Sequence, residues 1–171
     1  MGKKLESMVE IINLMTRGNQ DALEKANIIL GNIKDNKNAE DIFAAWVQMI
    51  FSVLCDYDPI KEEWGSQFVM QTSDCEETLD VFIQKLTMIQ KVRGLTFEME
   101  KKWFEGKESI ACWGKILNTH LESLRLCVCV FPTGGSTYEY SILTNEEKDK
   151  VIYLSSQIFE EKSKRIFEMG E

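Results

Sequence analysis

Several residue types and patterns are scarce in this chain, and each scarcity excludes a class of function. His120 is the only histidine among the 171 residues, which excludes metal sites built on several histidines and acid–base chemistry by paired histidines. Pro59 and Pro132 are the only prolines, so long helices are allowed nearly everywhere. The longest apolar run, Ile42 to Cys55, is shorter than the roughly 20 residues needed to span a bilayer. We interpret it as a buried helix and expect no stable membrane insertion.

Basic segments are scarce as well. The chain has 20 Lys and Arg against 28 Asp and Glu, giving a formal net charge of −8. The short basic sequence KSKR at residues 162–165 lies among glutamates. Nucleic-acid binding needs a basic face that neutralises phosphates, so we expect no nucleic-acid partner. The same charge disfavours adhesion to anionic membranes.

The five cysteines show no spacing typical of a disulfide framework, and no signal peptide precedes them, which predicts an intracellular, cytoplasmic protein. Cys127 and Cys129 could form a metal site with Cys55 and Cys75, but the valine-rich context of the C-x-C pair favours packing in a core. The sequence PTGGST lacks the spacing of a phosphate-binding loop. We therefore predict neither a metal nor a cofactor.

Apolar residues recur at helical spacing along most of the chain, and polar capping residues mark where several helices begin. A turn is expected at residues 34–38, after which Asn38 caps the apolar helix. Two capping boxes are predicted, Ser73 with Glu76 and Thr144 with Glu147. The predicted helices cover residues 5–15, 21–33, 42–55, 73–94, 97–104, 109–128 and 144–166.

These patterns predict an all-α fold, in which residues 1–171 form a single helical domain. We expect a globular bundle of six to eight helices around a hydrophobic central helix. One alternative concerns residues 128–142, where CVCVF and STYEYSI flank PTGG. Because these flanks are β-branched or aromatic, the segment could instead form a short hairpin.

The segment WFEGKESIACWGKIL, residues 103–117, is the most unusual part of the sequence. Gly114 lies inside a predicted helix, where glycine costs about 1 kcal/mol relative to alanine. That cost is tolerated where another helix must pass close to the backbone. The close neighbour could belong to this chain or to a bound partner, and on the residues alone we favour packing within the chain.

The region from Phe97 to Val130 resembles the signature region of the B-cell lymphoma 2 family of apoptosis regulators. Phe104-Glu105-Gly106 resembles the turn that ends an amphipathic helix in that family. Trp113-Gly114-Lys115-Ile116 resembles the family's Asn-Trp-Gly-Arg motif, with lysine in place of arginine. Leu117 to Val130 resembles the family's hydrophobic central helix.

This resemblance implies that the chain holds an amphipathic partner helix in a groove. Gly114 would permit the close approach of that helix, and Lys115 would pair with an aspartate on it. Phe97 and Phe104 would form a groove wall. The resemblance thus implies a partner-binding set made up of Phe97, Phe104, Trp113, Gly114, Lys115 and Leu117.

We therefore predict a non-enzymatic protein–protein interaction module, with a divergent, pathogen-like apoptosis-regulator fold as its sharpest version. The alternative is a helical adaptor, chaperone or assembly protein without a groove. An enzyme, or an enzyme subunit, with a site made of dispersed carboxylates and cysteines is the less favoured third hypothesis. Cys112 and His120 would lie about 12 Å apart on one helix, too far for direct activation. No catalytic residue is predicted.

Overall fold

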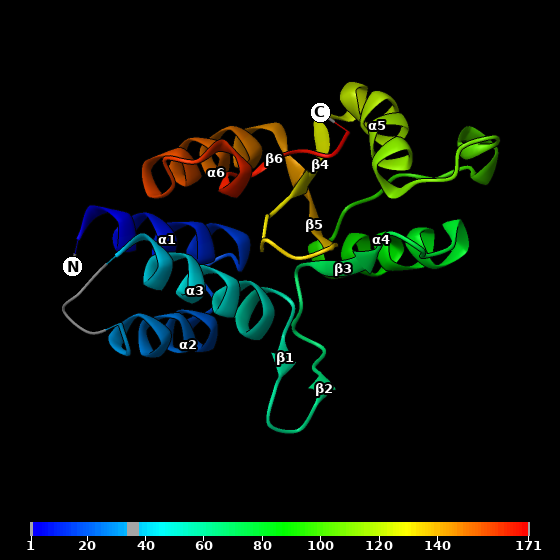
Figure 1. The fold of residues 1–171 in the computed structure, drawn as a ribbon. Coiled ribbons are helices and arrows are strands. Elements are labelled where there is room, and N and C mark those ends of the chain that lie inside the picture. The colour runs from blue at the N-terminus through cyan, green and yellow to red at the C-terminus, as the bar shows by residue number, and fades with distance from the viewer. Residues whose placement is uncertain (1, 34–37, 171) are drawn as a thin grey trace.

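The structure is a computed structural model that describes residues 2–33 and 38–170 (Figure 1). Within this part of the chain, six α-helices accompany a two-stranded and a four-stranded antiparallel sheet. The α-helices are α1 (Lys3–Met15), α2 (Gln20–Gly31), α3 (Ala39–Met49), α4 (Leu79–Arg93), α5 (Ile110–Leu121) and α6 (Asn145–Ile158). The strands are β1 (Tyr57–Asp58), β2 (Glu63–Trp64), β3 (Gln71–Asp74), β4 (Leu126–Val130), β5 (Thr137–Thr144) and β6 (Phe167–Glu168).

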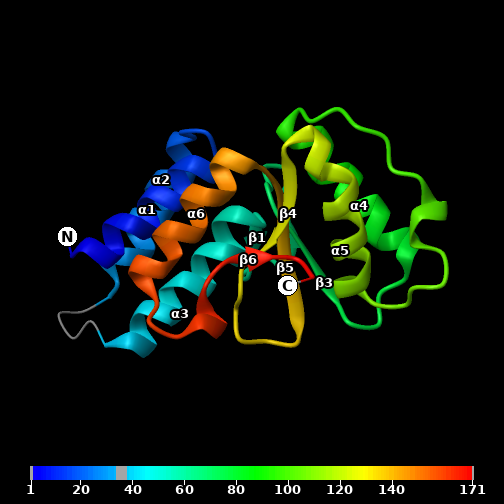
Figure 2. The ribbon, with the colours of Figure 1, turned by 90° about the horizontal axis from the view of Figure 1, so that it is seen from above.

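The four-stranded sheet divides the molecule into two helical layers. Its strand order is β3-β5-β4-β6. Figure 2 shows α1, α2, α3 and α6 on one side of the sheet and α4 and α5 on the other. Each layer encloses its own apolar core: Met8, Trp46 and Leu154 belong to the first, and Phe82, Trp113 and Leu117 to the second.

The prediction of an all-α fold is wrong, and β4 shows why. Cys127 and Cys129 on β4 face the first core, whereas Val128 and Val130 face the second. A strand that is covered on both faces is apolar without interruption, so its sequence lacks the alternation typical of a half-exposed strand. The run therefore also fits the end of a long helix, but the structure ends that helix at Leu121.

The alternative hairpin is confirmed. β4 and β5 pair in antiparallel register, with Cys129 opposite Ser141 and Val130 opposite Tyr140. The connection runs through Pro132 and Gly134, and Gly134 has the positive φ of 77° that glycine tolerates best. The segment taken as the family's central helix, Leu117 to Val130, is thus half helix and half strand.

Several local predictions are confirmed because they depend on neighbouring residues alone. Asn38 caps α3 by accepting a hydrogen bond from the Asp41 amide, and Thr144 forms its capping box with Glu147. The apolar helix continues from α3 into a π-helix at Ile50–Leu54 and is largely buried. The rest of the turn expected before Asn38, residues 34–37, lies outside the described residues.

Three local predictions are wrong. Ser73 belongs to β3 rather than to a helix cap, and Thr78 caps α4 instead. The helix expected over residues 97–104 is reduced to a short 3-10 turn, Lys101–Phe104. The last α-helix ends at Ile158, and Ile166 lies beyond it. At Ser73, pairing with β5 overrides the local capping pattern.

Across residues 2–33 and 38–170, every helix is too short or too polar to cross a bilayer.

Candidate functional site

A hairpin formed by β1 and β2 projects from the body of the molecule (Figure 1). Tyr57 pairs with Trp64 and Asp58 with Glu63. The turn begins at Asp58, whose carboxylate Oδ1 accepts hydrogen bonds from the amides of Ile60 (2.9 Å) and Lys61 (3.2 Å). These two bonds lower the pKa of the Asp58 carboxyl below its ordinary value. Pro59 then presets the backbone at the position after aspartate, the combination that this kind of turn favours.

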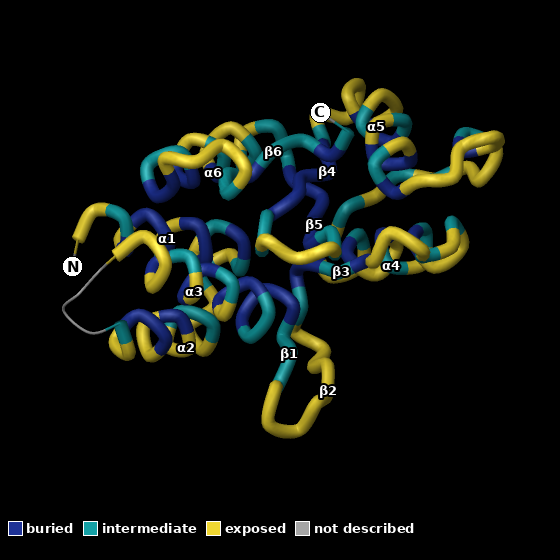
Figure 3. The backbone as a smooth tube through the Cα atoms, viewed as in Figure 1, coloured by how far each residue is buried: buried dark blue, intermediate teal, exposed yellow. Residues whose placement is uncertain are grey.

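The hairpin exposes large apolar side chains. Ile60 at the turn is 93% exposed and Trp64 on β2 is 55% exposed. Figure 3 shows this projection as an exposed segment attached to a buried core. The Trp64 ring packs against the Tyr57 ring, with a centroid distance of 4.8 Å. Exposed tryptophan and isoleucine on a projecting element are typical of protein-binding surfaces.

Asp56 fixes the base of the hairpin. Its carbonyl accepts a hydrogen bond from the Gly65 amide (2.7 Å), and its carboxylate Oδ2 accepts one from the Gln67 amide (2.9 Å). Its Oδ1 lies 3.5 Å from Lys25 Nζ on α2. Asp56 therefore joins both legs of the hairpin to each other and to the helical layer.

The close packing at Asp56 explains the glycine that follows the hairpin. A Cβ atom added to Gly65 would lie 1.9 Å from Asp56 Oδ2. Asp56 itself has a φ of 54°, which is unusual for a residue other than glycine but best tolerated by Asp and Asn. Unusual backbone conformations held by their surroundings are often found at functional sites.

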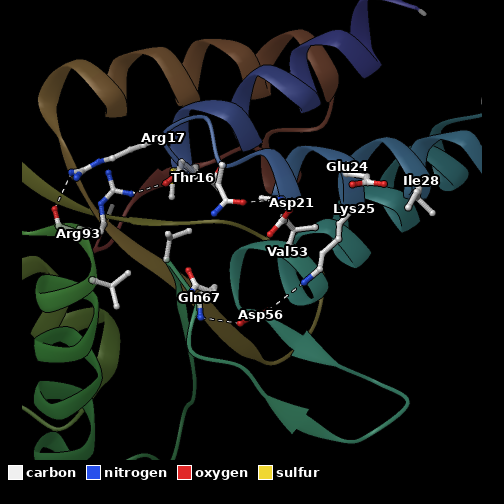
Figure 4. A pocket seen from close by; sticks show the side chains of 15 residues that line it. Thr16, Arg17, Asp21, Glu24, Lys25, Ile28, Val53, Asp56, Gln67 and Arg93 are labelled. Atoms are coloured by element: carbon white, nitrogen blue, oxygen red, sulfur yellow. Dashed lines mark hydrogen bonds and ion pairs between the residues drawn. The ribbon is translucent and has the colours of Figure 1, made fainter.

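Two hollows flank the ion pair between Lys25 and Asp56. The larger, of about 540 Å³, lies between α2, the C-terminal end of α4 and the segment that leads into β3 (Figure 4). The smaller, of about 260 Å³, lies between α2 and β1. Lys25, Ile28 and Asp56 line both hollows. Ile28 is 60% exposed, so it offers an apolar contact beside each hollow.

We call this region the hairpin surface. It consists of the exposed side chains of the hairpin and the linings of the two hollows. Its defining residues are Lys25, Ile28, Asp56, Tyr57, Ile60 and Trp64.

A buried ion pair closes the far end of the larger hollow. Both carboxylate oxygens of Glu147 lie 2.7 Å from Arg93 Nη2, and Nη1 of the same guanidinium donates to the Met15 carbonyl (3.2 Å). Burial lowers the pKa of Arg93, and Glu147 opposes that shift. Arg17 donates to the Arg93 carbonyl (2.9 Å) and lies beside Arg93, at the same end of the hollow, in Figure 4.

The residues implied by the family resemblance lie elsewhere, and most are packed inside the molecule. Phe104, Trp113 and Leu117 are buried in the second core, where Trp113 contacts Phe82 at a ring distance of 5.6 Å. Phe97 is half-buried at the edge of that core. Phe104, Trp113 and Leu117 thus contribute to the core between the sheet and the layer of α4 and α5.

Gly114 is also buried, beneath the C-terminal segment of its own chain. A Cβ atom on Gly114 would lie 2.2 Å from Met169 Cγ. The close approach that the glycine predicted is therefore present, but the neighbour is Met169 and not a partner helix. Lys115 remains exposed and lines a separate polar hollow of about 500 Å³ beside Glu168 and Gly170.

The histidine and the C-x-C pair noted in the sequence both pack against neighbouring side chains. His120 stacks on Trp103 at a ring distance of 3.8 Å. Cys127 and Cys129 are buried with their sulfur atoms 4.0 Å apart. Within the part of the chain that the structure describes, no group of three or more His, Cys, Asp or Glu side chains is placed to hold a metal ion.

The buried carboxylate of Glu139 connects β5 to neighbouring segments. It accepts hydrogen bonds from the hydroxyls of Thr72 (3.2 Å), Thr133 (2.8 Å) and Thr137 (2.5 Å). A fully buried carboxylate with its oxygens occupied in this way stabilises the sheet and has no access to a substrate.

The hairpin surface is not among the sites predicted from the sequence. Residues 56–74 contain the pair Asp58-Pro59, which favours a turn. Trp64 follows two glutamates, a context that favours exposure to solvent. The two strands have only two residues each, too few to show an alternating pattern. Comparisons of the chain with protein families, curated proteins and solved structures found no match.

Proposed function

We propose that this chain is a non-enzymatic interaction module that binds another protein through the hairpin surface. The observation that carries the proposal is the exposure of Ile60 and Trp64 on a projecting hairpin whose base is fixed by Asp56. A fixed projection loses little conformational freedom on binding, so its apolar contacts contribute more fully to affinity.

The partner element we propose is an amphipathic segment, with a helix as its simplest form. Two hollows that share Ile28 in their linings suit two apolar side chains from one face of such a segment. This retains the type of partner implied by the family resemblance and moves its contact from Gly114 to the hairpin surface. It also differs from the alternative of an adaptor with no groove, which would need no hollow at its contact.

We also propose a cytoplasmic setting. Its support is that all five cysteines are free thiols, including Cys75 and Cys112, which are exposed. Exposed free thiols suit a reducing compartment.

The test compares capture of cellular proteins by three forms of the full chain. The wild type, the variant Ile60→Ser/Trp64→Ala and the control Leu124→Ser/Tyr153→Ser are each immobilised, and captured proteins are quantified by mass spectrometry. Leu124 and Tyr153 are also exposed but lie on the 3-10 turn Glu122–Leu124 and on α6, away from the hairpin.

We expect a captured set that the wild type and the control share and that the hairpin variant loses by about tenfold or more, as expected when central aromatic contacts are removed. Circular dichroism establishes that all three forms are folded. Equal capture by the hairpin variant and the wild type would contradict the proposal.

A further inference from the structure

The charges around the hairpin surface indicate the chemistry of its partner. We infer that the bound segment is cationic as well as apolar, with Lys or Arg beside its apolar anchors. This inference rests on the proposed function, because it concerns the partner of the same surface.

The rim of the surface is acidic on both sides. The hairpin contributes Asp58, Glu62 and Glu63 against one cation, Lys61. On the opposite side, α2 contributes Asp21 and Glu24 beside Lys25, as Figure 4 shows. Together with Asp56 and Arg17, the surface carries six acidic and three basic side chains.

Two of the three cations are already engaged. Lys25 Nζ lies 3.5 Å from Asp56 Oδ1, and Lys61 Nζ lies 3.4 Å from Asp58 Oδ2. Among the described residues, the four remaining carboxylates have no ion pair within 4.0 Å; they are Asp21, Glu24, Glu62 and Glu63. They are available to a cationic partner without first breaking a contact within the chain.

The buried guanidinium nearby does not cancel this acidity. The charge of Arg93 is matched by Glu147, so the pair adds no net charge to the hollow. The third cation, Arg17, lines the larger hollow beside Arg93, to whose carbonyl it donates a hydrogen bond. An apolar centre with an excess of acid around it favours a partner with the opposite charge at its rim.

The experiment uses three fluorescent peptides with the same leucine positions on one helical face. Their polar positions carry lysine, glutamine or glutamate. Binding to the full chain is measured by fluorescence anisotropy. We expect the lysine peptide to bind about tenfold more tightly than the glutamine peptide at low salt, and the glutamate peptide to bind most weakly. The advantage of lysine should fall as salt is raised, because exposed charges are screened.

Two charge variants locate the effect. Glu62→Gln/Glu63→Gln removes two charges from the hairpin, and Glu105→Gln/Glu108→Gln removes two from the exposed loop before α5. Both variants change the net charge by the same amount. We expect the hairpin variant to weaken binding of the lysine peptide by roughly threefold to tenfold, and the loop variant to leave it nearly unchanged.

The outcomes separate this inference from the proposed function. If the lysine and glutamine peptides bind equally, or if both charge variants weaken binding equally, a cationic partner is excluded. The proposed function would still stand if Trp64→Ala then abolished binding of the glutamine peptide. If Trp64→Ala changed no binding at all, the proposed surface itself would be wrong.

Discussion

Met169 lies directly over Gly114, so that a Cβ atom added to the glycine would be 2.2 Å from both Cγ and Sδ of the methionine. The contact is fixed from both sides. Met169 donates its amide to the Val128 carbonyl (2.9 Å), and Asn118 on α5 donates to the Met169 carbonyl (3.1 Å). The glycine in the middle of α5 therefore serves the return of the chain's own C-terminal segment.

This contact predicts that Gly114→Ala destabilises the protein. We expect a loss of about 1–3 kcal/mol of unfolding free energy, because overpacking a filled core has that cost and outweighs the helical preference for alanine. In a Met169→Ala background the same substitution should cost less, because the Cγ and Sδ atoms at 2.2 Å are removed and only the Cβ at 2.8 Å remains close. Urea unfolding of the wild type, the two single variants and the double variant gives the interaction free energy between the two positions. Independent effects of the two substitutions would show that the contact is absent.

The pair Arg93 and Glu147 predicts a large effect of removing one charge. Glu147→Gln retains an oxygen for the cap of α6 but leaves the buried guanidinium without its partner, so we expect a loss of about 3–5 kcal/mol. The matched control is Glu146→Gln, on the exposed face of the same helical turn, which should cost less than about 1 kcal/mol. Thermal and urea unfolding measure both. Similar losses for the two variants would mean that the pair contributes nothing specific.

The contacts of Asp56 predict that the hairpin can be loosened while the helical layers and the four-stranded sheet stay folded. In Asp56→Ala the Gln67 amide loses its acceptor and the backbone keeps an unfavourable φ, so exchange of that amide should accelerate about tenfold or more. Asp56→Asn keeps an oxygen and tolerates the same backbone conformation, so it should behave close to the wild type. Hydrogen exchange followed by NMR distinguishes them. Unchanged exchange in the alanine variant would show that the Asp56 carboxylate does not hold the hairpin.

The five thiols should fall into two classes of reactivity. Cys75 and Cys112 are exposed, whereas Cys55, Cys127 and Cys129 are buried. Burial raises the pKa of the Cys55 thiol, with Glu139 adding to the shift, and the contact with Cys127 together with burial raises the pKa of Cys129. Because the thiolate is the reactive form, raised values keep these thiols unreactive at mildly alkaline pH.

A thiol-reactive dye at pH 8 tests this division. We expect two thiols per chain to react quickly in the native protein and all five after denaturation in guanidinium. The variant Cys75→Ser/Cys112→Ser should show almost no fast reaction. A fast third thiol in that variant would place Cys55, Cys127 or Cys129 at the surface.

The helix caps show which parts of the fold can be predicted from residues that are close in the sequence. Asn38, Ser109 and Thr144 each bind a backbone amide three residues away, so their sequence context is enough to mark where a helix begins. The same reasoning failed at Ser73, which instead bonds to Tyr140 across the sheet (2.8 Å). A partner distant in the sequence changed the role of a residue whose local pattern suggested a cap.

The candidate site was still less accessible to sequence reasoning. The hairpin has strands of two residues, and its base depends on Lys25 from α2 meeting Asp56 after α3. Neither residue has a neighbour in the sequence that indicates the other. The hollows likewise exist only where α2, α4 and the segment before β3 come together.

The sequence by itself determined the acidic charge, the amphipathic helices and their caps, and the need for close approach at Gly114, because each of these depends on composition or on residues a few positions apart. The tertiary structure decided that Cys127 to Val130 form a strand, that Met169 occupies the space over Gly114, and that Ile60 and Trp64 are left exposed. Those outcomes depend on which distant segments pack on each face. The residues next to a position in the chain do not indicate which segments these are.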